Sequence, residues 1–185
     1  MRASKRQRGG HQYRWSGLNS IQGAFLSGAQ PIIAIDLVPS KLAAAQSFGA
    51  THTVNPTEQE PLAAVRSLTQ GRGADYVFVT VGSPKAMEQG LTLLRRAGTL
   101  VLVGMPGVGA KLQLEVVDVA DNGQCILGSK MGSTRPHLDI PKLVELYRQG
   151  RLKLDELITA RYPLEQINEA IAAVKRGEAL RNVIM

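Results

Sequence analysis

Residues 31–36 constrain the fold more than any other part of the chain. Four apolar residues, Ile32 to Ile35, run up to Asp36, between Gly28 and a helix-starting Ser40. A short, continuous apolar run bounded by turn residues is typical of a strand buried on both faces, as in a parallel sheet. The segment therefore predicts an α/β fold.

Asp36 stands where such folds bind ligands. In doubly wound sheets, ligands lie beyond the carboxyl ends of the strands. Gly17 precedes Asp36 by 19 residues, close to the ~20 residues that separate a dinucleotide-binding glycine turn from its ribose-binding acid. The spacing favours a nucleotide site. A buried strand whose acid only caps a turn gives the same pattern, so both interpretations stay open at this point.

The rest of the chain alternates apolar strands with amphipathic helices across short turns. This alternation predicts a parallel sheet with right-handed crossovers. The expected helices are 17–27, 40–48, 61–68, 85–96, 141–149 and 164–175, and the expected strands are 31–36, 52–54, 75–81, 99–105, 111–117, 124–130 and 181–185.

The positive charge belongs to the beginning of the chain. The net charge is +7, and no acid precedes Asp36. Removing the five basic residues of the first 16 leaves the remainder at +2. We therefore expect residues 1–16 to be a solvated, irregular basic arm and expect no nucleic-acid partner. A stand-alone binding or interaction module that uses this arm is the alternative.

Cysteine content and hydropathy indicate the compartment. Cys125 is the one cysteine, so an internal disulfide framework is excluded, which fits a reducing, cytoplasmic setting. No run approaches the ~18 apolar residues that a membrane span needs.

An ordered set of motifs carries a resemblance to a known family. Asp36 ends an Ile-Asp-Leu strand, and the next helix opens with Ser40-Lys41. Four further motifs follow in order: FGATHTVNP at 48–56, GRGADYVFVTVG at 71–82, GTLVLVG at 98–104 and YPLEQINEA at 162–170. This order resembles the medium-chain zinc-dependent alcohol dehydrogenases, nearest to their class III-like bacterial branch. The resemblance implies a Rossmann-type doubly wound parallel sheet over residues 17–185.

The resemblance also implies a site for NAD(H), from which the family transfers a hydride to or from a small alcohol or aldehyde. Asp36 matches the acid that binds the adenosine ribose, and this acid favours NAD over NADP because it repels a 2′-phosphate. Lys41 matches a ribose contact and Arg181 a pyrophosphate contact. The full set of matching positions is Gly17, Asp36, Lys41, Val81, Gly82, Val103, Ser129, Met131 and Arg181.

The family's catalytic domain is absent from this sequence. Its zinc site uses two cysteines and a histidine, whereas here Cys125 stands alone and the three histidines lie far apart. We therefore assign no catalytic and no metal-binding residue, expect Cys125 in the core, and expect a truncated chain that is inactive alone. The cofactor domain of a zinc-free quinone reductase remains an alternative. A methyltransferase also places an acid after its second strand, but the matches from Gly71 onward argue against that class.

The first strand of the fold is replaced or degraded. Family members have an apolar strand followed by a glycine turn at this position. Here residues 6–16 read RQRGGHQYRWS, with Gln12 and Arg14 at two of the glycine positions. A shifted reading frame before Gly17 is one explanation, which the nucleotide sequence would decide. At the opposite edge, the resemblance implies a homodimer that pairs through strand 124–130.

Overall fold

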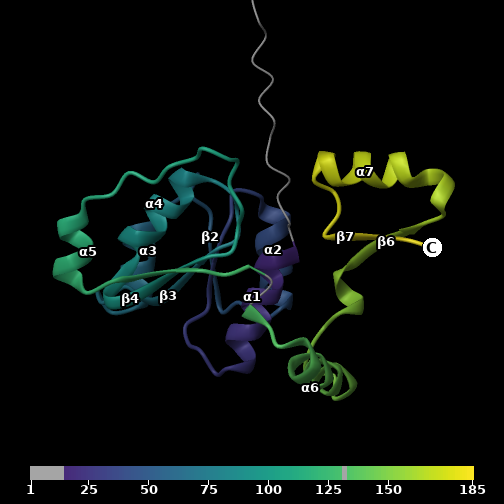
Figure 1. Ribbon diagram of the computed structural model, residues 1–185, viewed down its shortest axis with the longest axis horizontal. Coiled ribbons are helices and arrows are strands. Elements are labelled where there is room, and N and C mark those ends of the chain that lie inside the picture. Colours follow the sequence, from purple (N-terminus) through teal and green to yellow (C-terminus); the bar gives the residue numbers. More distant parts are fainter. Residues whose placement is uncertain (1–14, 131–132) are drawn as a thin grey trace, which may run out of the picture.

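The computed structural model describes residues 15–130 and 133–185 of the chain. Helices and strands alternate along most of it (Figure 1). The helices are α1 (Trp15–Leu26), α2 (Pro39–Ser47), α3 (Pro61–Leu68), α4 (Pro84–Thr92), α5 (Val116–Asn122), α6 (Pro136–Arg148) and α7 (Ile167–Arg176). The strands are β1 (Ile33–Ile35), β2 (His52–Val54), β3 (Ala74–Val79), β4 (Leu94–Leu102), β5 (Cys125–Gly128), β6 (Ile158–Tyr162) and β7 (Arg181–Ile184).

All strand pairs among the described residues are parallel, as the alternating pattern predicts. β1 pairs with β2, and Ala34 lies opposite Thr53. β3, β4 and β5 form a second sheet in that order. Phe78, Val101 and Leu127 are neighbours across it. The order β2-β1 followed by β3-β4-β5 is that of a Rossmann sheet without its first strand.

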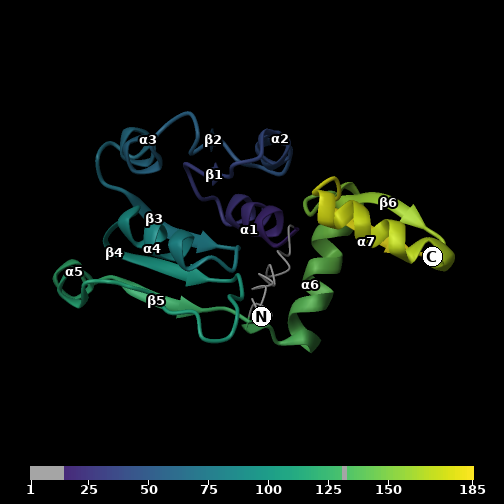
Figure 2. The same cartoon turned by 90° about the horizontal axis from the view of Figure 1, so that it is seen from above.

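Helix α1 connects the two sheets. Leu18 is buried in one core cluster with Ile32 and Ala34, which lie in and next to β1, and with Leu42 of α2. One residue earlier, a Cβ on Gly17 would lie 3.3 Å from Oγ1 of Thr80, just after β3. Figure 2 shows α1 between the two sheets. The helix therefore packs on both halves of the domain.

The second core cluster lies between β3, β4 and α4. Leu100 is fully buried, and Val79, Met87 and Leu91 pack around it. These residues recur at the strand and helix periods that the sequence shows, so one face of each element is apolar. The cluster fixes the carboxyl ends of β3 and β4 relative to each other.

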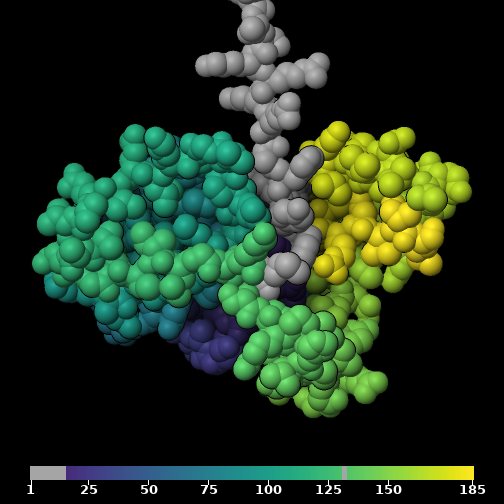
Figure 3. All heavy atoms as spheres, in the orientation of Figure 1, coloured from purple at the N-terminus to yellow at the C-terminus, as the bar shows by residue number. Residues whose placement is uncertain are grey.

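The carboxyl-terminal residues form a unit of their own. β6 and β7 pair with each other, and α7 packs on β7. The unit stands beside the main body in the ribbon and space-filling views (Figures 1 and 3). Leu157, which immediately precedes β6, is fully buried in the α1 and α2 core cluster. The strand predicted at 181–185 is thus present, but its partner is β6 rather than the main sheet.

The end of one predicted element and the type of another, within residues 85–117, are wrong. The helix expected over 85–96 ends at Thr92, because β4 already pairs at Leu94 with Ala74. A register shift follows, and Ala97 has a positive φ of 55°. The strand expected over 111–117 is not formed, and α5 begins at Val116 instead. Its valines favour a strand by propensity, but Gly123, with φ of 59°, ends a helix here.

Four smaller differences from the expected elements remain. Strand β6 was not predicted, and α6 begins at Pro136 rather than at 141. Trp15 and Ser16, which were expected in the irregular arm over 1–16, lie in α1; residues 1–14 lie outside the described part. Cys125, expected in the core, is exposed. It lies at the edge of the three-stranded sheet, where only one side of the strand is covered.

Candidate functional site: the carboxyl ends of β1, β3 and β4

Asp36 lies directly after β1, at the carboxyl end of the small sheet. Its N–H donates to the carbonyl of Val54 at 3.3 Å, which extends the pairing with β2. Its Oδ1 accepts a hydrogen bond from the N–H of Val38 at 2.9 Å. This Asx-type turn leads into α2, whose first residue is Pro39. The backbone thus holds the carboxylate at the strand end.

Lys41 joins Asp36 from the first turn of α2. Its Nζ lies 3.3 Å from Oδ2 and 3.4 Å from Oδ1 of Asp36. The two side chains are 21% and 30% exposed for Lys41 and Asp36. They are therefore reachable from solvent although they contact each other. The carboxylate can accept hydrogen bonds from a diol, and the ammonium can donate to one of its oxygens.

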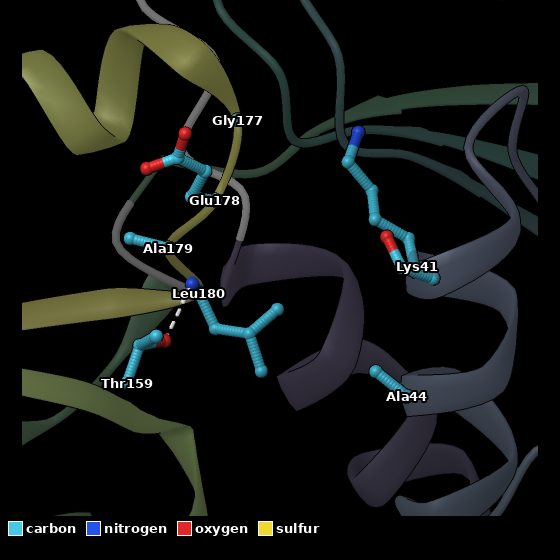
Figure 4. Close-up of a pocket in the computed structure, with 8 residues that line it drawn as sticks. Lys41, Ala44, Thr159, Gly177, Glu178, Ala179 and Leu180 are labelled. Atoms are coloured by element: carbon cyan, nitrogen blue, oxygen red, sulfur yellow. Dashed lines mark hydrogen bonds between the residues drawn. The ribbon is translucent and has the colours of Figure 1, made fainter.

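A cavity of about 250 Å³ opens beside Lys41. Lys41 and Ala44 of α2 form one wall, and Thr159 and residues 177–180 form the other (Figure 4). The N–H of Leu180 donates to Oγ1 of Thr159 at 2.8 Å, which ties the second wall to β6. The pair of charged side chains therefore lies next to a recess between α2 and the carboxyl-terminal unit.

The loops after β3 and β4 touch through glycines. A Cβ on Gly82 would lie 2.8 Å from the carbonyl carbon of Met105, and closer still to its oxygen. A Cβ on Gly104 would lie 2.6 Å from the nitrogen of Val81. Val103 lies in the same group, since its N–H donates to the carbonyl of Val79 at 3.0 Å. The structure therefore brings together Val81, Gly82 and Val103.

The remaining predicted residues are more scattered. Gly17 lies against Thr80, near the same strand ends. Ser129 follows β5 and donates its N–H to the carbonyl of Leu102 at 2.9 Å. Arg181 begins β7, one residue after the cavity wall at Leu180. Met131 lies outside the described residues.

The sequence analysis did not predict the cavity wall that Thr159 and residues 177–180 form. One signal was available, because Gly177 follows the periodic helix α7 and ends it with φ of 88°. That glycine predicts a turn at this point of the chain. It does not predict that the turn packs against α2, more than 130 residues earlier, since such packing is a property of the tertiary fold.

Neither a metal-ligand cluster nor a membrane-spanning helix occurs in the part of the chain that the structure describes. Within 15–130 and 133–185, no three or more His, Cys, Asp or Glu side chains are placed to hold a metal ion. In the same ranges, no helix has the length and apolar character needed to cross a bilayer.

Parallel strands in Rossmann order, an acid after the second strand of the fold and glycines at the neighbouring strand ends define a Rossmann-type nucleotide-binding domain. The family model for zinc-binding dehydrogenases matches residues 17–149. The chain belongs to the zinc-binding dehydrogenase family.

Individual relatives agree with this membership. The class-3 alcohol dehydrogenase of Cereibacter sphaeroides is 36% identical over 177 residues, which are 91% of this chain and 47% of the relative. A zinc-binding-domain alcohol dehydrogenase from Burkholderia ambifaria superposes with a TM-score of 0.88 at 39% identity, over 92% of this chain and 45% of that one. Benzyl alcohol dehydrogenase from Acinetobacter calcoaceticus superposes with a TM-score of 0.86 at 37% identity, over 91% of this chain and 46% of that one. The chain spans about half the length of these relatives.

Proposed function

We propose that this chain is the NAD(H)-binding half of an alcohol or aldehyde oxidoreductase. The observation that carries the proposal is the carboxylate of Asp36, which the backbone holds at the end of β1 beside Lys41. A carboxylate in this position of a Rossmann sheet binds the adenosine ribose. Gly82 and Gly104 let the loops after β3 and β4 pack backbone to backbone, which fixes these two strand ends relative to each other.

Charge favours NAD over NADP. A 2′-phosphate on the ribose would lie against the carboxylate of Asp36 and be repelled. Leu37, the next residue, is apolar and 62% exposed, so it offers no compensating cation. Lys41 is close by, but it already contacts the same carboxylate.

The roles of the chain's own residues are binding and orientation. Asp36 and Lys41 would hold the ribose, Val81, Gly82 and Val103 would line the path toward the nicotinamide, and Arg181 would reach the pyrophosphate. The bound NAD supplies the hydride-accepting ring. Zinc and substrate binding would come from a catalytic domain, because the described residues offer no ligand cluster for a metal.

Calorimetric titration with NAD⁺ tests the cofactor site. We expect saturable binding to the chain, and we expect Asp36→Ala to weaken it by about 10- to 100-fold, the value of hydrogen bonds to a charged group. Asp118→Ala, which removes an acid from the first turn of α5, serves as the control and should bind as the parent does. Equal affinity of the parent and Asp36→Ala would exclude the ribose assignment.

We also propose a reducing, cytoplasmic compartment, which suits the single cysteine. In addition, we propose a homodimer that pairs through the free edge of β5. β5 pairs only with β4 among the described strands, and Leu127 is 50% exposed. Unpaired apolar edges associate readily. Sedimentation should show a dimer that Leu127→Lys shifts toward monomer, whereas Val38→Lys, at an exposed apolar site elsewhere, leaves it unchanged. A monomeric parent would contradict the proposal.

A further inference from the structure

A groove of about 780 Å³ runs along α4 to the amino ends of β3, β4 and β5. We call it the α4 groove, and its volume is within the range of small-molecule sites. Arg72 lies two residues before β3, Leu94 begins β4 and Gln124 directly precedes β5. Because the strands are parallel and the six residues of β3 rise about 3.3 Å each, about 17 Å separates this end of the groove from the carboxyl ends of the strands. The groove therefore reaches the edge of the sheet opposite the candidate cofactor site.

Two contacts hold the outer wall of the α4 groove, which is the segment 113–124. Oε1 of Glu88 on α4 accepts a hydrogen bond from the N–H of Gln113 at 2.8 Å. The guanidinium of Arg96 on β4 donates to the carbonyl of Asp121 at 2.9 Å. Leu91 and Leu94 line the groove and are each 8% exposed, so they form its floor. The wall is thus tied to α4 at one point and to β4 at another.

Arginines gather where the α4 groove meets the amino ends of the strands. The turn at residues 71–73 packs on the start of β4, since a Cβ on Gly73 would lie 2.9 Å from the nitrogen of Arg95. The guanidinium of Arg95 donates a hydrogen bond to Asp75, which is the main cause of a lowered Asp75 pKa, and the charge of Arg72 adds to it. Arg66 lies in the last turn of α3. This end of the groove is therefore rich in positive charge.

Arg66 and Arg72 are the arginines of the α4 groove that are available to a ligand. The N–H of Gly71 donates to the carbonyl of Arg66 at 2.7 Å, so the two arginines lie one tight turn apart. Both line the groove and are exposed, and among residues 15–130 and 133–185 no hydrogen bond or ion pair engages either guanidinium. A guanidinium presents paired N–H donors that match the oxygens of a phosphate group. This turn is therefore suited to a phosphoryl group.

The opposite wall of the α4 groove has a different chemistry. Its charged side chains are the carboxylates of Glu115 and Asp118, and Glu115 makes no side-chain hydrogen bond to the helix that it caps. Amide side chains also line the groove, namely Gln89, Gln113, Asn122 and Gln124. Carboxylates and amides accept and donate hydrogen bonds to hydroxyl groups, whereas two carboxylates repel a second phosphate. This wall is therefore suited to hydroxyls and not to another anion.

We propose that the α4 groove binds a polyol that carries one phosphoryl group, such as a sugar phosphate. The phosphoryl group lies at Arg66 and Arg72, and the hydroxyls lie at Glu115, Asp118 and the amide side chains. The C–H groups of the polyol pack on the leucine floor, as the apolar lining of a small-molecule site does. This site goes beyond the proposed function and does not depend on it.

Glucose 6-phosphate is the probe that tests the α4 groove on the full chain, with inorganic phosphate and glucose as comparators. Calorimetry should show saturable binding of the probe, at least tenfold tighter than either comparator. In NMR titrations, the amide signals of Gly71, Arg72 and Asn122 should shift with the probe. Gly82 and Ser129, at the carboxyl ends of the strands, should not shift.

Substitutions separate the two halves of the α4 groove. Arg66→Gln and Arg72→Gln should each weaken the probe about tenfold or more, the value of hydrogen bonds to a charged group. Asp118→Asn should weaken the probe and leave inorganic phosphate unchanged. Arg151→Gln, at an exposed arginine outside the groove, is the matched control and should bind as the parent does.

Four outcomes would overturn the proposal. The first is no saturable binding of glucose 6-phosphate, and the second is inorganic phosphate that binds as tightly as the probe. The third is an equal effect of Arg72→Gln and Arg151→Gln. The fourth is a set of shifts centred on Gly82 and Ser129, which would place the probe in the cofactor site. Titration with NAD⁺ in a separate experiment tests the cofactor proposal, so the two proposals can fail independently.

Discussion

The side-chain amide of Gln22 forms hydrogen bonds with both backbone groups of Lys153. Its Nε2 donates to the Lys153 carbonyl at 3.0 Å, and its Oε1 accepts from the Lys153 N–H at 2.7 Å. Gln22 is only 3% exposed on α1. The pair therefore ties α1 to the segment that leads into the carboxyl-terminal unit.

Replacing Gln22 with Leu should destabilise the fold. The substitution leaves the Lys153 N–H and carbonyl without these partners, which costs about 1–3 kcal/mol. The free energy of unfolding, measured in urea, should fall by that amount. Gln46→Leu on the exposed face of α2 is the control and should change it little. Equal stabilities of the two variants would show that the pair contributes nothing.

Coenzyme preference should follow the charge beside the ribose. In the double variant Asp36→Ser and Leu37→Arg, the repelling carboxylate is lost and a cation is gained, so NADP⁺ should bind at least tenfold more tightly than it binds the parent. NAD⁺ affinity should fall in the same variant. Fluorescence or calorimetric titration with both coenzymes measures the ratio. An unchanged ratio would place the ribose away from residue 36.

A methyl group at either contacting glycine should disturb the strand ends. Gly82→Ala or Gly104→Ala pushes a Cβ into the backbone of the other loop, and neither loop can yield as a side chain would. We expect each to lower the unfolding free energy by about 2 kcal/mol or more. Gly107→Ala is the matched control, since a Cβ there would meet no heavy atom within 4 Å and its φ is not left-handed. Thermal denaturation measures the difference.

Glu60 should make stability depend on pH. Its carboxylate caps α3 by accepting hydrogen bonds from the N–H groups of Leu62 and Ala63, at 2.9 and 2.7 Å. These two hydrogen bonds lower the pKa of Glu60 below its ordinary 4.5, and the bond from Leu62 has the larger effect. A lowered pKa in the folded state stabilises the protein above the ordinary value, and the effect is lost as pH falls through the folded-state pKa.

The measurement compares Glu60→Gln with the parent in thermal melts at several pH values. The variant should melt at a lower temperature near neutral pH, and the difference should shrink below pH 4.5. Glu115→Gln is the control, because Glu115 occupies the same cap position of α5 without a side-chain cap hydrogen bond. A difference that stays constant with pH would contradict the assigned role of the Glu60 charge.

Sequence predicted most of the domain because its elements carry local signals. The strand at β1, the helix start at Pro61, the start of α2 to within one residue, and the parallel pairing were predictable from apolar runs, prolines and glycine turns. The early end of α4 could not be predicted in this way. Leu93 and Leu94 suit either a helix or a strand, and the pairing of Leu94 with Ala74 determines that β4 begins there. The exposure of Cys125 depends on its strand lying at an edge, which local pattern does not encode.

The residues of the candidate site also fall into two groups: those that local sequence signals predict and those that only the tertiary fold brings to the site. Asp36 and Gly82 follow strand ends, where chemistry and position are linked. The structure pairs Asp36 with Lys41, and it brings the loop of Gly82 into contact with that of Gly104. The wall at residues 177–180 comes from a distant turn, and its Leu180 packs against the core cluster that α1 and α2 share with Leu157. Such contacts require the tertiary fold.

That wall is the turn between α7 and β7. Proteolytic cleavage in this turn would loosen one side of the recess while leaving Asp36 in place. Coenzyme affinity would then report whether the turn is intact.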